Sequence, residues 1–153
     1  MTFFQAGTAY NIIPGTAKLG GTIRTLDPAV RKQAAERVKQ VVEGICAANG
    51  ADVDFEFKDG YPTTSNHPEQ TKFATRIAAE IAGSADKVNE NIAPTMGGED
   101  FAYYLEEKPG AFIFIGNGDT AGLHHPKYDF NDEAIPYGCS YFIKLVETAL
   151  PAT

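Results

Sequence analysis

The chain has 153 residues, 43% of them hydrophobic and 22% charged, and a formal net charge of -7. Its length is that of about one ordinary domain, with enough apolar residues for a hydrophobic core. The acidic charge argues against binding to nucleic acid and to anionic membrane surfaces, because both require a basic patch. The sequence has no run of about 18 apolar residues, so it predicts no membrane span.

The cysteines and the first residues suggest a cytoplasmic protein. Cys46 and Cys139 lie far apart, each at an apolar-face position of a predicted helix. We expect two buried free thiols in a reducing compartment, because no spacing supports a disulfide or a metal pair. Residues 1–5 have no basic stretch followed by an apolar one, so the sequence predicts no signal peptide.

The first sixty residues predict part of a small antiparallel α+β unit. Residues 2–4 begin a strand, and polar and apolar residues alternate across 17–25 and again across 53–57, which is typical of strands buried on one face. Asp27, followed by proline, predicts the start of a helix, and Asn49, followed by glycine, predicts its end. The order strand, strand, helix, strand favours an antiparallel sheet with a helix on one face.

From about residue 61 the pattern changes to that of an α/β domain. Asn66 and Glu69 have the spacing of a capping box before a helical stripe that ends at Gly83. A short helix is predicted near Glu99. Residues 111–115 are all apolar, which predicts a strand buried on both faces, as in a parallel sheet.

A long loop and a last helix complete the predicted α/β part. Residues 117–129 form a loop of a length that is usually functional or disordered in a compact domain. The last helix is predicted from about Asp132. Its inward-facing residues are expected to be Ile135, Cys139, Phe142, Leu145 and Val146.

Two adjacent histidines lie in the long loop that follows the apolar strand. Loops at the carboxyl ends of α/β strands are common ligand sites, so His124 or His125 is a candidate metal ligand or general base. Adjacent side chains in an extended loop usually point apart, so we expect only one of them to reach a given site. Two solvated loop histidines are the simpler interpretation of the residues alone.

Two further features are candidates for binding an anionic ligand. Gly97 and Gly98 precede a predicted helix, where a missing side chain lets a ligand approach free main-chain amides. A plain turn before acidic first-turn residues is the alternative. Arg24 and Asn11 flank a turn and have the chemistry to bind a carboxylate, although a surface arginine and a turn asparagine are the simpler interpretation of these residues alone.

Together these segments resemble bacterial hippurate hydrolases, aminoacylases and carboxypeptidase G, a family of metal-dependent amidohydrolases. Each motif is weak alone, but together they are specific, because they cover nearly the whole chain in order. They are Gly7–Pro14, Gly21–Thr25, Met96–Phe101, Leu123–Pro126 and Phe130–Ala134.

The resemblance implies a fold with two domains. Residues 1–60 are expected to be the second half of a ferredoxin-like lid domain, which often mediates dimerisation, so a homo-oligomer is expected. Residues 61–153 are expected to be the C-terminal elements of an α/β zinc-peptidase-like catalytic domain. The complete enzyme is expected to hold two divalent metal ions (Zn, Mn, Co or Ni) and to hydrolyse N-acyl amino acids, such as hippurate, with metal-activated water.

The resemblance also assigns roles to individual residues. Arg24 and Asn11 correspond to lid residues that bind the free carboxylate of the substrate. Gly97 and Gly98 correspond to a loop that lines the substrate pocket. His124 corresponds to the last metal ligand, with His125 the less favoured choice.

The family's other metal ligands and its general base have no counterpart in this sequence. Three histidines and two cysteines predicted to be buried cannot build a two-metal site. We therefore expect a C-terminal fragment of the enzyme that is inactive alone, has no catalytic residue of its own, and binds metal weakly or not at all. The alternative is a non-catalytic truncated module that self-associates through its lid half.

Overall fold

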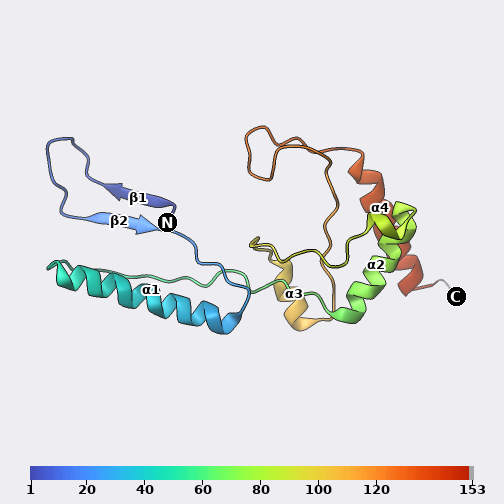
Figure 1. Cartoon of the computed structure of the whole chain (residues 1–153), viewed down its shortest axis with the longest axis horizontal. Helices are drawn as coiled ribbons and strands as arrows, with labels where there is room; N and C mark the ends of the chain where they lie inside the picture. The colour runs from blue at the N-terminus through green and yellow to red at the C-terminus, as the bar shows by residue number, and fades with distance from the viewer. Residues whose placement is uncertain (152–153) are drawn as a thin grey trace. The chain divides into compact units, whose positions relative to one another are not determined.

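The computed structural model describes residues 1–151, which form two compact units. The first unit comprises residues 1–63 and 94–98, and the second comprises residues 64–93 and those from 99 onward. The elements, labelled in Figure 1, are β1 (Phe3–Ala6), β2 (Ala17–Gly20), α1 (Pro28–Ala48), α2 (Pro68–Ala82), the 3-10 helix η1 (Ala85–Lys87), α3 (Phe101–Glu107) and α4 (Ala134–Ala149).

The sheet of the first unit is smaller than predicted. Strands β1 and β2 pair antiparallel, with Phe3 opposite Gly20 and Ala6 opposite Ala17. The predicted strand 17–25 stops at Gly20, which lies opposite Phe3, the first residue of β1. Thr2 N donates the last hydrogen bond at this end, to Gly20 O at 3.0 Å. Residues 53–57 are not a strand, so that prediction is wrong. Polar and apolar residues alternate there in the sequence, but no neighbouring strand pairs with these residues in the part of the chain that the structure describes.

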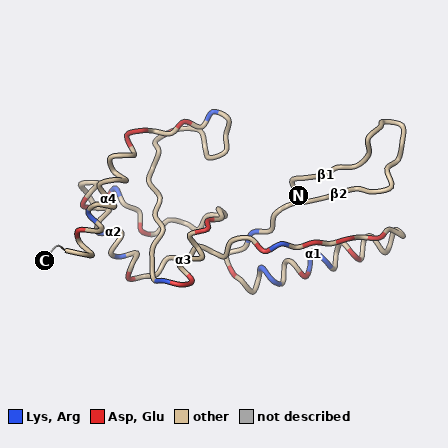
Figure 2. The backbone as a smooth tube through the Cα atoms, turned by 180° about the vertical axis from the view of Figure 1, so that it is seen from behind, with Lys and Arg blue, Asp and Glu red and all other residues tan. Residues whose placement is uncertain are grey.

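Helix α1 begins and ends as predicted. The Asp27 carboxylate accepts hydrogen bonds from the main-chain N–H groups of Ala29 at 2.7 Å and Val30 at 3.0 Å, and Asn49 caps the C-terminus. No residue of α1 is buried, and Cys46 is half-buried rather than buried as predicted. Lys, Arg and Glu are interspersed along the helix (Figure 2). Within residues 1–151, no helix is long and apolar enough to cross a membrane.

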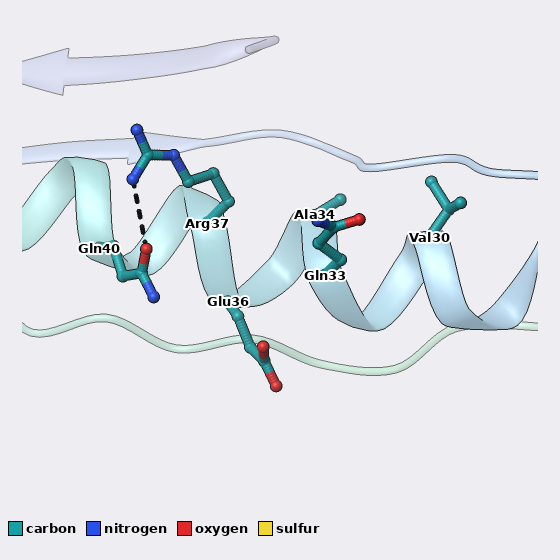
Figure 3. A pocket seen from close by; sticks show the side chains of 6 residues that line it. All are labelled: Val30, Gln33, Ala34, Glu36, Arg37 and Gln40. Carbon is teal, nitrogen blue, oxygen red and sulfur yellow. Dashed lines mark hydrogen bonds between the residues drawn. The ribbon is translucent and has the colours of Figure 1, made fainter.

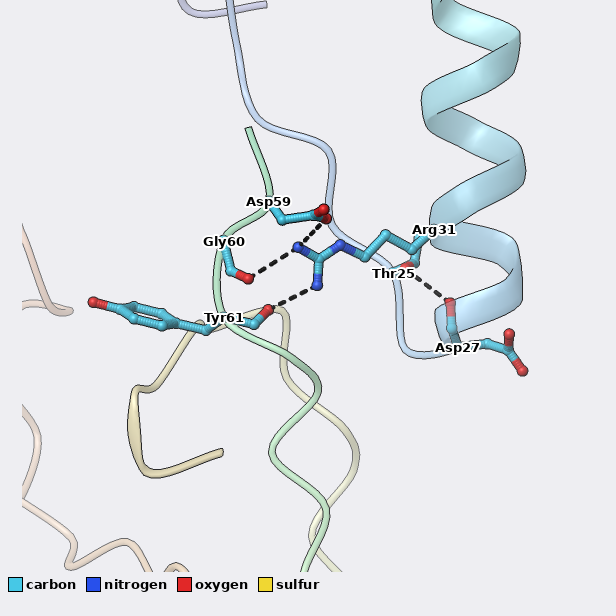
Figure 4. A network of polar contacts seen from close by, with 6 residues as sticks. All are labelled: Thr25, Asp27, Arg31, Asp59, Gly60 and Tyr61. Atoms are coloured by element: carbon cyan, nitrogen blue, oxygen red, sulfur yellow. Dashed lines mark hydrogen bonds and ion pairs between the residues drawn. The ribbon is translucent and has the colours of Figure 1, made fainter. Parts of the chain in front are cut away.

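Arg31 attaches the start of α1 to residues 59–61 of the same unit (Figure 4). Its guanidinium forms an ion pair with Asp59 at 2.8 Å and donates to the carbonyl oxygens of Gly60 at 2.9 Å and Tyr61 at 3.1 Å. The Arg31 side chain is about three-quarters covered, with 24% exposed. Because three consecutive residues bind one planar group, the path of the chain out of residues 53–58 is fixed relative to α1.

The core of the second unit lies between α2 and α4. Ile77 is fully buried, and Ala74 and Tyr141 are 5% exposed. The predicted α2 stripe and its end are confirmed, because Gly83 adopts the left-handed conformation that terminates the helix. The residues packed against this core are Phe73, Ala78, Ile81, Ala111, Ile113 and Leu145.

Helix α4 packs through a different face from the one predicted. Gly138, Tyr141 and Leu145 face the core, whereas four of the five residues predicted to face inward are exposed: Ile135, Cys139, Phe142 and Val146. The exposed stripe is offset by one residue from the buried one, which is about 100° around a helix. The prediction that Cys139 is buried is therefore wrong. The stripe is as apolar as a core face, but the described residues leave it uncovered.

Residues 110–115 run extended through the second unit, but they do not form the predicted strand. The Asn66 side chain donates to Phe112 O at 2.8 Å and accepts from Phe112 N at 2.8 Å. His67 N donates to Gly110 O at 3.0 Å, and Gly110 N donates to His67 Nδ1 at 3.2 Å. The prediction that Asn66 caps α2 is therefore wrong. The capping residue is His67, and its side chain makes no hydrogen bond to the helix.

We expect Asn66→Ala to lower the free energy of unfolding of the second unit by about 1–2 kcal/mol, because two hydrogen bonds to the main chain are lost. Urea unfolding followed by circular dichroism measures this change. Asn91→Ala is the matched control, since the Asn91 side chain makes no hydrogen bond within residues 1–151. Equal stabilities for the two variants would contradict the stabilising role of the hydrogen bonds between Asn66 and Phe112.

Burial raises the pKa of the Tyr141 hydroxyl above its ordinary value of 10.0. The folded state therefore holds this proton more tightly than the unfolded state. The associated stability is complete below about pH 10 and is lost as the pH rises through the folded-state pKa. We expect Tyr141→Phe to reduce the loss of stability above about pH 10. Urea unfolding across this range tests it, with exposed Tyr137→Phe on the same helix as control.

Candidate functional site

The loop that carries both adjacent histidines is closed at its neck by one side chain. Asn117 Nδ2 donates to Asp129 O at 2.7 Å, and Asn117 Oδ1 accepts from Asn131 N at 2.7 Å. Thr120 Oγ1 adds a longer contact to Asp129 O at 3.5 Å. Residues 117–131 therefore form an Ω-type loop. The Asn117 side-chain amide holds its two ends together through hydrogen bonds to main-chain atoms. The sequence predicts the loop but not the role of Asn117, because an asparagine in a loop carries no signal of what it binds.

His124 lies at a tight turn within this loop and has an unusual backbone. His125 N donates to Gly122 O at 3.1 Å, which closes the turn. His124 has a φ of 65°, and among the described residues no other non-glycine residue has a positive φ. Histidine enters this left-handed region more readily than most residues, but the conformation still carries strain that is most often found at functional sites.

The hydrogen bonds of the three histidines differ. Nδ1 of His67 accepts from Gly110 N at 3.2 Å, and Nδ1 of His125 accepts from Lys127 N at 3.1 Å. A neutral imidazole that accepts at Nδ1 carries its proton on Nε2, so neither nitrogen is left with a lone pair for a metal ion. The ring of His124 is exposed and makes no hydrogen bond within the described residues. Of the two adjacent histidines, His124 is thus the one with a nitrogen available for coordination.

Within residues 1–151, no group of three or more His, Cys, Asp or Glu side chains is arranged to hold a metal ion. A typical zinc site uses three or four protein ligands. In the described part of the chain, His124 therefore supplies one donor and not a complete metal site.

In the first unit, the structure brings Arg24 to the glycine pair. Arg24 Nη1 donates to Met96 O at 2.8 Å, directly before Gly97 and Gly98. A Cβ added to Gly98 would lie 3.5 Å from the Tyr61 ring, which is ordinary contact, so the local backbone alone does not require glycine there. The other nitrogens of the guanidinium make no bond within the described residues, which leaves Nη2 and Nε for a second acceptor.

Asn11 and Arg24 lie beyond opposite ends of the β-hairpin. Asn11 is in the exposed loop after the Ala6–Ala17 pair, whereas Arg24 follows β2 beyond the Phe3–Gly20 pair. A four-residue strand alone spans about 13 Å. One small carboxylate does not reach across that distance to both side chains of one hairpin, so their joint role stays a prediction.

A shallow hollow of about 540 Å³ lies along α1 (Figure 3). Arg37 Nη1 donates to Gln40 Oε1 across it at 3.3 Å. None of the predicted site residues lines this hollow, and it contains no histidine, cysteine or paired carboxylates. Its lining residues are Val30, Gln33, Ala34, Glu36, Arg37 and Gln40.

Residues 5–148 match the model of Peptidase family M20/M25/M40, and the chain belongs to this family. The resemblance inferred from the motifs is thereby confirmed. The match covers almost the whole chain, including the His124 loop, Arg24 and the glycine pair.

Particular relatives are similar over nearly all of the chain. The N-acetylcysteine deacetylase of Bacillus subtilis is 35% identical over 150 residues, which are 98% of this chain and 38% of the relative. The hippurate hydrolase of Campylobacter jejuni is 34% identical over 142 residues, 93% of this chain and 37% of the relative. The chain thus spans less than half the length of the relatives it matches.

A solved structure confirms the fold at the level of the family. The Bacillus subtilis YxeP protein, described as a dinuclear metal binding peptidase from the M20 family, superposes with a TM-score of 0.76 and 34% identity. The match covers 99% of this chain and 41% of that chain. The two units described above therefore have the fold of the corresponding part of an M20 peptidase.

Proposed function

We propose that this chain is the substrate-binding and terminal metal-binding part of an M20 amidohydrolase that cleaves the amide bond of N-acyl amino acids. The relatives named above include a deacetylase and a hippurate hydrolase, which supports amide hydrolysis. The observation that carries the proposal is the His124 ring. It has no hydrogen bond within residues 1–151, it lies in a left-handed turn, and its loop is closed by Asn117.

Neutral imidazole is a good ligand for Zn, Mn, Co or Ni, so His124 fits the two-metal site expected of the whole enzyme. The dinuclear metal centre of the YxeP protein supports that expectation. The bound ions would lower the pKa of a water molecule and polarise the amide carbonyl. The role of this chain is to present the His124 nitrogen from a closed loop and to orient the substrate.

Arg24 would bind the free carboxylate of the substrate while it holds the glycine loop. Nη1 is engaged by Met96 O, and Nη2 with Nε can form a second, charge-assisted pair of hydrogen bonds. The amides of Gly97 and Gly98 would then lie close to the same ligand, because Met96 directly precedes them. Asn11 lies beyond the other end of the same hairpin, so its expected contact with the substrate carboxylate is a separate proposal from that of Arg24.

The second candidate function is that of a non-catalytic module that self-associates through the first unit. The uncovered apolar face of α1 favours it, since Val30, Val38, Val41 and Ile45 are all 39–61% exposed. The coding sequence upstream discriminates between the two functions. An in-frame metal motif rich in Cys and His favours the hydrolase.

We expect His124→Ala to weaken binding of at least one metal ion by about 100-fold or more, because loss even of residues that merely orient a ligand costs about 10–100-fold. The measurement uses a chimera in which this chain replaces the matching segment of the Bacillus subtilis deacetylase, with metal content and hydrolysis as readouts. His125→Ala is the matched control. If the folded chimera holds two ions without His124, the assignment is wrong. If the 153-residue chain cleaves hippurate unaided, the proposal that it supplies only one part of the metal site is wrong.

In the same chimera, we expect Arg24→Ala to raise KM for N-acyl amino acids roughly tenfold or more. Loss of a hydrogen-bonded charge costs about 1.5–3 kcal/mol. The effect should disappear with substrates whose carboxylate is replaced by an amide. Arg37→Ala is the control, because the bond of this arginine within residues 1–151 is to Gln40 of the same helix. Unchanged kinetics on hippurate would contradict the carboxylate contact.

A further inference from the structure

Tyr61 carries its aromatic ring on a backbone that is anchored on both sides. The carbonyl oxygens of Gly60 and Tyr61 accept hydrogen bonds from Arg31 at 2.9 and 3.1 Å. Two residues after Tyr61, Thr63 Oγ1 donates to Leu26 O at 3.3 Å. Figure 4 shows the ring pointing away from Arg31 and from α1. Because Tyr61 is 52% exposed, this anchored backbone presents an accessible aromatic surface.

The Tyr61 ring faces the second glycine of the pair in the same unit. A Cβ added to Gly98 would point at the ring and would lie 3.5 Å from its Cδ2 atom, at ordinary van der Waals distance. Apart from the chain neighbours of Gly98, no other described atom lies within 4 Å of that position. The ring and the main chain of Gly98 therefore border a space that fits a methyl-sized group, which we call the Tyr61–Gly98 slot.

The fold itself does not explain why residue 98 lacks a side chain. Gly83 has a left-handed backbone, with a φ of 76°, and a Cβ at Gly110 would lie only 3.0 Å from Leu105 Cδ2. Gly98 has neither a positive φ nor so close a neighbour. Alanine would fit there, but its methyl group would fill the slot. Glycine at this position therefore keeps open a space beside an aromatic ring.

The slot lies close to Arg24 along the chain. Arg24 Nη1 donates to Met96 O at 2.8 Å, and Met96 is two residues before Gly98, so at most about 7 Å separates their Cα atoms. In an N-acyl amino acid, the side chain branches from the carbon that carries the carboxylate, whereas the acyl group lies beyond the amide nitrogen. A substrate held by its carboxylate at Arg24 thus brings its amino acid side chain nearer to the slot than its acyl group.

We propose that Tyr61 is a specificity-determining residue, and that the Tyr61–Gly98 slot binds an apolar side chain of the amino acid part of the substrate. An aromatic wall favours an apolar group, which gains contact and leaves water, over a charged group that finds no partner there. The inference rests on the proposed function and names the part of the substrate that the proposed function leaves open.

The first test measures kcat/KM of the chimera described above for N-acetyl-leucine and for N-acetylglycine. Tyr61→Ala should lower the leucine-to-glycine ratio about tenfold or more, because the leucine side chain loses an apolar wall and glycine has no side chain to lose it. Tyr61→Phe keeps the ring and should keep the ratio. Both substrates are measured on one preparation, so a loss of folded protein cancels in the ratio.

Gly98→Ala tests the slot from its other side. The added methyl group occupies the space, so the leucine-to-glycine ratio should again fall by about tenfold or more. Phe57→Ala is the matched control, an aromatic residue of the same unit that is 40% exposed, and it should leave the ratio unchanged. Replacing the acetyl group by benzoyl in both substrates should leave the effects of Tyr61→Ala and Gly98→Ala unaltered.

The second test needs neither hydrolysis nor metal. N-acetyl-leucine and N-acetylglycine are titrated separately into the isotopically labelled 153-residue chain, and amide chemical shifts are followed by NMR. N-acetyl-leucine should shift the Gly98 amide more than N-acetylglycine does, and Tyr61→Ala should abolish the difference. If the chimera hydrolyses no N-acyl amino acid but this difference is present, the proposed function fails and the slot stands.

Three outcomes overturn the inference. The first is an active chimera whose leucine-to-glycine ratio is unchanged by either Tyr61→Ala or Gly98→Ala. The second is an effect of these variants that follows the acyl group rather than the amino acid side chain, which would place the acyl group in the slot. The third is an inactive chimera together with a Gly98 amide that responds equally to both compounds, and this result contradicts the proposed function as well.

Discussion

The hydrogen bonds from Asn66 and His67 to the extended segment at Gly110 and Phe112 hold the second unit together. They join the start of α2 to residues more than forty positions later, without a second strand. Because the segment is fixed there, Ala111 and Ile113 reach the α2–α4 core, and Phe112 reaches the ring of Phe101 in α3. The segment then continues into the loop that carries His124. The anchoring of this segment therefore also fixes the point at which the His124 loop begins.

The predicted binding residues belong to both units, and each unit carries a different kind of chemistry. The first unit supplies a cation, Arg24, already bonded to the main chain in front of a glycine pair. The second supplies an imidazole on a closed loop. In the part of the chain that the structure describes, neither unit has a group of three or more His, Cys, Asp or Glu side chains that could hold a metal ion.

The sequence was sufficient where a local signal decides the structure. Asp27 before a proline set the start of α1, and Gly83 set the end of α2, because capping depends on residues a few positions apart. The family could be inferred because five short motifs occur in order. The failures concern contacts with groups elsewhere. Residues 53–57 alternate correctly but have no strand to pair with, and the apolar stripe of α4 that contains Cys139 has no described element to cover it. Asn66 has the residue type and spacing of a helix cap, yet its amide is used on Phe112 instead.

Asn117 is followed by Gly118, and this dipeptide is the one in which an asparagine side chain most readily loses its nitrogen to become an acid. The lost NH₂ group is the donor to Asp129 O at 2.7 Å. A carboxylate in its place would face that carbonyl oxygen with a negative charge and would no longer close the loop from that side. The neck of the His124 loop is thus a point of chemical ageing, at which a slow spontaneous reaction would remove one of the bonds that hold its ends together without any change in the gene.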